Sequence, residues 1–312
     1  GGDRPSTLPL AVALALAWLL VRARRRRQLR GAVVAAAMAA VVLAGGQASA
    51  APSRAGMSID HFQLRPGDDR AMFSVSGSEV APAWSPYAGL WIQYVDDPLV
   101  LVAEQADGSG ETHHRLVRNR TIGTLAVGIG LFDLAEVELA LPAILDQHGE
   151  ERIFPSVGKA AVGDLDLRVR FRLMERDDFA GFGLNLGLGA SFPIGSRTAL
   201  AGDGGVTIRP RVDLSYGLGP VLLAFNLRFD IRSRPASFQN VEVSHDLAWG
   251  LGVRWDIIER VALGAEVFGK ARLTSPFSES AETPIEFVAG PRVRIWEGLT
   301  AEAGAGAGLQ GG

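Results

Sequence analysis

Residues 163–173 read GDLDLRVRFRL, and this stretch decides between a helix and a strand. Apolar side chains stand at positions 165, 167, 169, 171 and 173. Charged side chains stand at the alternating positions 164, 166, 168, 170 and 172. An α-helix, with 3.6 residues per turn, would mix the two kinds on every face, whereas a β-strand places them on opposite faces. The pattern therefore predicts a strand with one apolar and one charged face.

The same alternation recurs along the rest of the chain. Val221–Arg232 carries an apolar row on every second residue, and Phe182–Phe192 sets apolar residues opposite Gly, Asn and Ser. Eleven strands are predicted, at 86–95, 121–131, 135–145, 163–173, 180–192, 205–216, 221–232, 241–255, 260–272, 284–295 and 299–309. Most have 10–13 residues, against roughly 5–6 in globular proteins and about 9–11 for a tilted transmembrane strand.

The predicted connections alternate in length. Short turns fall near 132–133, 174–178, 217–220, 256–259 and 296–298, and long loops fall at 96–120, 146–162, 193–204, 233–240 and 273–283. Short turns on one side and long loops on the other are typical of outer-membrane barrels. We therefore predict an all-β fold, an antiparallel up-and-down transmembrane β-barrel of about 12 strands, of which 11 are visible. Phe132, Trp255 and Trp296 mark its short-turn end, as an interfacial aromatic girdle would.

Alternation alone does not say which face is inside. In a soluble sandwich the apolar face is the core, and the chain would then be a secreted all-β binding protein. In a membrane barrel the apolar face meets lipid and the charged face lines the lumen. The length of the strands and the segregation of the loops favour the barrel, and closure removes exposed strand edges.

In a barrel, eleven acidic and eleven basic residues line the lumen. The acidic ones are Glu136, Glu138, Asp164, Asp166, Asp213, Asp230, Glu242, Asp246, Glu266, Glu286 and Glu302, and the basic ones are Arg168, Arg170, Arg172, Arg209, Arg211, Arg228, Arg232, Arg254, Lys270, Arg292 and Arg294. An ion-selective lumen would carry an excess of one sign. The balance instead predicts cross-strand pairing and a packed, structural interior. The alternative is a small-solute pore with a weakly selective wall, because small inward residues such as Gly183, Gly250 and Gly304 leave room.

The first 50 residues are predicted to lie outside the barrel. Residues 24–50 have the basic region, the short apolar run and the small residues before Ala51 that indicate a secretory signal peptide. The alternative, one inner-membrane anchor made of both apolar runs, would bury the arginine cluster between them. Residues 51–83 are predicted to form a periplasmic lead-in, and 84–312 the barrel. Because single-chain barrels usually have an even number of strands, we expect either a twelfth strand after residue 312 or closure of the sheet by Ala71–Val75.

Composition excludes several classes of function. The chain has no Cys, which excludes disulfide scaffolds, thiolate zinc sites and Cys nucleophiles. Residues 1–50 hold seven Arg and one Asp, so the remainder carries 24 basic and 33 acidic residues, a net charge of −9. A nucleic-acid-binding protein normally carries a basic face, so nucleic acid is not an expected partner.

Two segments resemble known families. Residues 1–23, which are Gly-rich, then apolar, then Arg-rich, resemble a myxobacterial C-terminal sorting tail, which implies that they are not part of the native fold. Pro86–Leu90, Asp96–Val100 and the turn Gly128–Asp133 with the following Val137–Pro142 resemble the barrel half of myxobacterial outer-membrane protein A-like (OmpA-like) proteins, and the likeness extends to about residue 309. It implies a structural role or passive diffusion of small solutes in the outer membrane, with peptidoglycan bound only through a further domain that this sequence does not contain.

Catalytic and metal-binding residues are scarce. His113 and His114 stand beside Glu111, where a solvated polar loop is a simpler interpretation than a surface metal site. His148, near Asp146, is the best candidate for a barrel enzyme that acts at its extracellular rim, with His113 as the second choice. The Gly-x-Gly runs lie inside strands and open no helix, so they are not phosphate loops. We therefore expect no catalytic residue, no metal and no cofactor, and a barrel of the cell outer membrane whose partners are lipid and small solutes.

Overall fold

The computed structural model describes residues 53–54, 72–104, 111–149, 160–238, 241–273 and 283–309. The predicted tail-like segment and signal peptide in residues 1–50, and most of the lead-in before Met72, lie outside these residues. The strands are β1 (Ser53–Arg54), β2 (Pro86–Glu104), β3 (Glu111–Leu131), β4 (Ala135–Gly149), β5 (Ala161–Val162), β6 (Leu165–Met174), β7 (Phe182–Phe192), β8 (Thr207–Leu218), β9 (Val221–Arg232), β10 (Ala236–Phe238), β11 (Val241–Val243), β12 (Asp246–Ile258), β13 (Val261–Arg272), β14 (Ile285–Trp296), β15 (Leu299–Glu302) and β16 (Ala305–Gly308). One short 3-10 helix, η2 (Arg176–Asp178), lies between β6 and β7.

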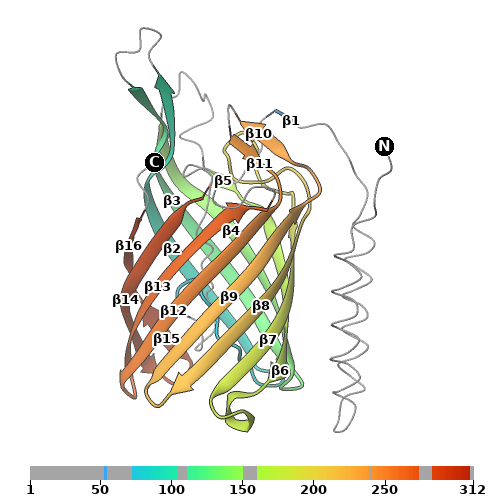
Figure 1. The fold of residues 1–312 in the computed structure, drawn as a ribbon, viewed down its shortest axis with the longest axis vertical. Helices are drawn as coiled ribbons and strands as arrows, with labels where there is room; N and C mark the ends of the chain where they lie inside the picture. Colours follow the sequence, from blue (N-terminus) through green and yellow to red (C-terminus); the bar gives the residue numbers. More distant parts are fainter. Residues whose placement is uncertain are drawn as a thin grey trace. The chain divides into compact units, whose positions relative to one another are not determined.

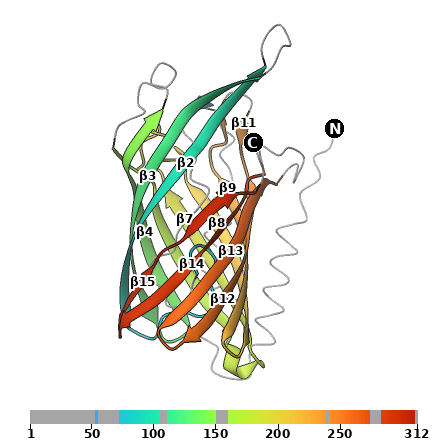
Figure 2. The same cartoon turned by 90° about the vertical axis from the view of Figure 1, so that its left-hand side faces the viewer.

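Thirteen of these strands form one antiparallel sheet. Its order is β2-β3-β4-β6-β7-β8-β9-β12-β13-β14-β15, with β5 beside β4 and β16 beside β14. Figures 1 and 2 show these tilted strands curling around a common interior. The predicted fold class, an antiparallel up-and-down β-barrel, is confirmed, and each of the eleven predicted strands has a counterpart in the sheet. Within the described residues, no helix is long and apolar enough to cross a membrane.

Cross-strand register explains why the charged faces fit together. Glu136 and Glu138 of β4 stand opposite Arg170 and Arg168 of β6. Directly opposed side chains of opposite charge stabilise a sheet, and a shift by one residue would turn every side chain to the other face. The alternating sequence therefore also selects the register.

Three parts of the sheet differ from the prediction. The hairpin β2–β3 continues to Glu104 and Glu111, where a long loop at 96–120 was predicted. Asp96, Asp97 and Pro98, at the start of the predicted loop, form an irregularity with Asp97 at a φ of +46°, after which the pairing resumes. The apolar residues that follow Pro98 have high strand propensity, which explains the extension.

The predicted strand at 241–255 begins only at Asp246. Residues 241–243 form β11, which pairs with β10 in a separate small sheet, and β10 also pairs with β1. The main-chain N–H of Arg232 donates to Nδ1 of His245 at 3.3 Å, and Nη1 of Arg232 binds the carboxylate of Asp246 at 2.8 Å. These bonds join the end of β9 to the start of β12. The pairing of these two strands in the main sheet goes no further.

The predicted strand at 299–309 is interrupted at residues 303–304. Pro291 on β14 faces this gap, and its carbonyl accepts the N–H of Ala303 at 3.1 Å. Proline has no N–H to return, so the ladder breaks into β15 and β16. The register is the same on both sides of the gap, since Arg292 pairs with Glu302 and Ala289 with Ala305.

The apolar face of the sheet is outside. Leu90, Ile92 and Tyr94 on β2 and Leu251 on β12 are exposed, whereas Asp213 on β8 is completely buried. In a two-layer sandwich the apolar rows would instead be buried between the layers. The sandwich interpretation is therefore wrong for the described strands, and the apolar side chains form a belt around the barrel.

The belt leads to a prediction about one strand. Leu251, near the middle of β12, is 56% exposed, and Ile258, at its short-turn end, is 62% exposed. In lipid, Leu251→Arg should lower the free energy of unfolding by about 2–4 kcal/mol and Ile258→Arg by only about 0–1 kcal/mol, because arginine is costly at the bilayer midplane. Denaturant unfolding of the protein refolded into lipid bilayers measures both. Equal costs at the two positions would contradict a membrane belt.

Candidate functional site

The candidate site is the interior of the barrel together with residues 72–83, which we call the inner segment. These residues precede β2 and are not part of a strand. The sequence predicts that these residues belong to a periplasmic lead-in, or that Ala71–Val75 forms a strand that closes the sheet. In the structure the segment instead lies inside the barrel, hydrogen-bonded to side chains of the inner wall. Buried main-chain N–H and C=O groups need partners, and here the wall provides them.

Glu266 on β13 holds the start of the inner segment. Its carboxylate accepts the N–H of Ser74 at 2.9 Å, the hydroxyl of Ser74 at 2.7 Å and the N–H of Val75 at 3.1 Å. Hydrogen bonds to a charged acceptor are stronger than neutral ones. Glu266 is itself buried, so losing these donors would leave a desolvated charge without partners.

Side-chain amides and hydroxyls hold the middle of the inner segment. Asn226 on β9 accepts the N–H of Ser76 at 2.7 Å and donates to its carbonyl at 2.8 Å, much as a neighbouring strand would. The hydroxyl of Ser215 on β8 contacts the hydroxyl of Ser78 and accepts its N–H at 3.3 Å. Asn185 on β7 donates to the carbonyl of Ser78 at 3.4 Å.

An ion pair of the wall also binds the segment. Nη2 of Arg170 on β6 lies 2.6 Å from Glu136 on β4, and both side chains are buried. Arg170 also donates from Nη1 to the carbonyl of Gly77 at 3.3 Å, and Glu136 accepts the N–H of Ala81 at 2.9 Å. The pair therefore joins two strands to each other and to the inner segment.

The segment leaves the interior at the β3–β4 turn. The carboxylate of Asp133 accepts the N–H of Ala83 at 2.7 Å. Phe132 and Asp133 have φ values of +57° and +55°, the geometry of a type I′ hairpin turn. The ring of Phe132 meets Trp84 edge-on at a centroid distance of 5.1 Å. This turn therefore fixes the point at which the chain enters β2.

The apolar side chains of the inner segment lie against glycines of the wall. A Cβ added to Gly250 would be 2.8 Å from Val75, and one added to Gly304 would be 2.8 Å from Phe73; Gly252 meets Met72 in the same way. These contacts are too short for any side chain on the wall. The small inward residues that suggested an open pore therefore make room for the inner segment.

Phe73 lies where the two ends of the sheet approach each other. The strand order begins at β2 and ends at β15, and no pairing joins these two among the described strands. The ring of Phe73 is 6.1 Å from that of Trp91 on β2 and packs against Gly304, next to β15. One aromatic side chain of the segment thus contacts both ends of the sheet.

Most predicted lumen charges occur as ion pairs. The pairs of these residues include Arg168–Glu138, Arg170–Glu136, Arg209–Asp166, Arg211–Asp213, Arg228–Asp230, Arg232–Asp246, Arg254–Asp256 and Arg292–Glu302. Three further residues have other positions. Arg172 pairs with Glu175 at the short-turn end, Arg294 is exposed at the end of β14, and Lys270 is partly buried on β13. The side chain of Glu242, in β11, is outside the described part.

The loop that connects β7 to β8 also enters the barrel. Buried Arg120 on β3 donates to the carbonyls of Leu200 at 3.1 Å and Ala199 at 3.0 Å. Asp164, which precedes β6, accepts the N–H groups of Gly195 and Asp203, each at 2.8 Å. Burial raises the pKa of the Asp164 carboxyl, and these two bonds partly offset the shift. The loop at 193–204 is thus fastened to the wall from inside.

The remaining predicted residues lie at the ends of the barrel. Phe132, Trp255 and Trp296 are exposed at its short-turn end. Nε2 of His148 lies 3.1 Å from Asp146, and both side chains are exposed. The side chains of Glu111 and His113 fall outside the described residues, and the described residues contain no cluster of three or more potential metal ligands.

The inner segment is not among the elements predicted from the sequence. One signal was present, because Ser74, Ser76 and Ser78 repeat with period two and place hydroxyls on one side of an extended chain. Three hydroxyls in a row, followed in the chain by strands with inward glycines, indicate a polar segment that needs partners.

Comparison of the chain with protein-family models and with the sequences of characterised proteins gave no match. Among solved structures, the chain is similar to an outer membrane channel from Pseudomonas putida F1, with a TM-score of 0.55 and 12% sequence identity. The similarity covers 79% of this chain and 92% of the other. At this identity the likeness concerns the fold, which is a barrel in both.

Two serines in contact provide a direct test of the inner segment. The hydroxyls of Ser78 and Ser215 touch, and the chain has no Cys. The double variant Ser78→Cys, Ser215→Cys should therefore form an intramolecular disulfide under mild oxidation, detected by thiol titration and by a mass loss of about 2 Da. The pair Ser78→Cys, Ser191→Cys, with both serines buried but not in contact, is the control. Free thiols in the first pair would show that the segment does not lie on β8.

Proposed function

We propose that the chain is an outer-membrane β-barrel channel for passive diffusion of small solutes, and that the inner segment closes it in this conformation. The apolar belt supports a lipid environment, since a charged inner wall and an apolar outer wall are the pattern of membrane barrels. The solved neighbour is itself described as an outer membrane channel. In this proposal the short turns face the periplasm, and a secretory signal in residues 24–50 provides export.

One observation carries the proposal. The inner segment is not paired as a strand with any strand of the wall. Every hydrogen bond cited above between it and β4, β6, β7, β8, β9 and β13 involves a wall side chain. Its displacement would break those bonds and no strand pairing of the barrel. The wall and the closure are thus physically separable, as a channel with a movable closure requires.

The wall indicates what would pass. Paired charges present a polar surface of nearly balanced sign, which favours small hydrophilic solutes over a single class of ion. The proposed role involves no catalytic step, cofactor or nucleic-acid partner.

A structural barrel that never opens is the second candidate. It is favoured by buried ion pairs such as Arg170–Glu136, which join strand to strand and strand to inner segment. Conductance separates the two candidates, because a purely structural barrel would stay closed when the inner segment is loosened.

Glu266→Gln should loosen the inner segment. It removes the charge that strengthens three hydrogen bonds, which should cost about 1.4 kcal/mol or more and raise the open fraction about tenfold or more. Single-channel recording in planar bilayers measures this fraction. Glu138→Gln is the matched control, because Glu138 is a buried carboxylate that binds Arg168 and Tyr87 of the wall.

The double variant Ser78→Cys, Ser215→Cys provides a second experiment on the same channel. In its oxidised form, combined with Glu266→Gln, the channel should stay closed, and reduction should restore the openings. Openings that persist in the oxidised form would mean that solutes follow a path that the inner segment does not block. No openings in any variant would favour the structural barrel.

A further inference from the structure

Glu266 is a buried carboxylate that is not neutralised by an arginine or lysine of the wall. Its residue is 2% exposed, and it forms no ion pair with any other residue in the described part of the chain. Glu136 and Glu138 are buried to a similar degree, and each binds an arginine of β6. A buried charge without a counter-ion costs free energy, so Glu266 depends on other partners.

The wall next to Glu266 is uncharged. Gly252 on β12 and Val288 on β14 are its cross-strand neighbours. Gly264 and Phe268 lie two residues before and after it, on the same face of β13. None of these four side chains can offset a negative charge, and three of them are small or apolar enough to leave the carboxylate open toward the lumen.

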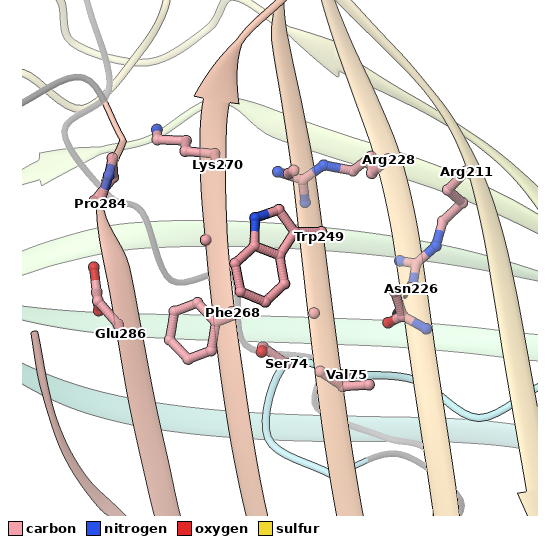
Figure 3. Close-up of a pocket in the computed structure, with 13 residues that line it drawn as sticks. Ser74, Val75, Arg211, Asn226, Arg228, Trp249, Phe268, Lys270, Pro284 and Glu286 are labelled. Carbon is pink, nitrogen blue, oxygen red and sulfur yellow. Dashed lines mark hydrogen bonds between the residues drawn. The ribbon is translucent and has the colours of Figure 1, made fainter. Parts of the chain in front are cut away.

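The inward cations of β12 and β13 do not serve this carboxylate either. On β12 the inward arginine is Arg254, and its Nε lies 3.0 Å from Asp256. On β13 the next inward cation is Lys270, four residues or about 13 Å further along the strand. Figure 3 shows Lys270 at a different level from Phe268 and Ser74. The wall therefore provides no counter-ion at the level of Glu266.

The partners that Glu266 has all belong to the inner segment. The three donors described above are the N–H and the hydroxyl of Ser74 and the N–H of Val75. A primary ammonium ion also has three N–H donors on one atom, and it carries the positive charge that the wall lacks at this place. Charge-assisted hydrogen bonds of this kind are stronger than neutral ones.

There is room for such an ion beside the segment. A cavity of about 60 Å³ is lined by Ser74, Val75 and Phe268, among other residues. Since a water needs about 10–15 Å³ of such space, the cavity has room for about four to six non-hydrogen atoms. Displacement of the segment would enlarge this space, because Gly250 and Gly252 have no side chains to fill it. The ring of Phe268 can also attract a cation over its face.

From these observations we infer that Glu266 is a binding site for small primary ammonium ions, which take the place of Ser74 and Val75 when the inner segment leaves the wall. The inference rests on the proposed channel function only in making these ions solutes of the channel. The ion and the segment compete for one carboxylate. A bound ammonium ion therefore favours the displaced segment by mass action, and the solute helps to open its own path.

Thiol labelling of the variant Ser76→Cys tests the site in the detergent-solubilised full chain, without any need for conductance. Ser76 is buried, its cited bonds are made by its main chain, and the chain has no other Cys. A charged, water-soluble thiol reagent should therefore react only when the segment moves. Ethylammonium chloride at about 0.3 M should raise the labelling rate about fourfold if the freed carboxylate binds it with a Kd of about 0.1 M.

The controls separate hydrogen bonding from charge and locate the site. Tetramethylammonium chloride at equal ionic strength has the same charge and no N–H donor, so it should leave the rate unchanged. In the Ser76→Cys background, Glu266→Gln should label faster and no longer respond to ethylammonium. Glu138→Gln, which removes a wall carboxylate bound to Arg168 and Tyr87, should keep the response.

Each other outcome overturns the inference. Equal rates in the two salts would mean that the segment does not compete with N–H donors, and this comparison decides even if Glu266→Gln does not fold. A response that persists in Glu266→Gln would place the effect of the amine elsewhere. A response without conductance would count against the channel and leave the site intact, whereas conductance without a response would remove the site alone.

Discussion

Main-chain amides that run through a barrel outside any strand must still be hydrogen-bonded, and this need explains the interior of the protein. The wall supplies carboxylate, amide and hydroxyl side chains where a neighbouring strand would supply carbonyls. Glu266 and Asn226 each take the place of a strand partner, the former with a charge and the latter with one donor and one acceptor. The inner segment can stay inside only because these side chains stand at inward positions.

The same need explains why a lumen of balanced charge is not simply filled by its own ion pairs. Arg170 and Glu136 neutralise each other and still have a spare donor and acceptor for the segment. The glycines complete the fit by removing side chains where Val75 and Phe73 approach the wall. The interior is thus packed, but part of the packing comes from a chain that is not wall.

Much of the fold could be predicted from the sequence, because period-two alternation is a local property. This alternation predicts the strands. Once a strand is recognised, the face on which each charged side chain lies follows, as for Arg168 and Glu138. The extension of β2 could not be predicted, because Asp97 and Pro98 have the local chemistry of a turn and only pairing with β3 keeps the strand going.

The inner segment was beyond local analysis for another reason. Ser74 finds Glu266 across 192 positions, and Ser78 finds Ser215 across 137. Such pairings depend on which strands are neighbours and how far the sheet curls. A stretch of ten residues determines neither. The charges and the glycines of the candidate site could be predicted from the sequence. That one segment of the chain contacts both of them could not.

These long separations have a consequence for how the molecule assembles. The segment that begins the described barrel has its partners on strands that come much later in the chain, as far as β13. Contacts between distant residues form slowly, since a long loop must close before they add stability. We therefore expect the residues that are synthesised before the wall to be the last to settle in it, after β13 has joined the sheet.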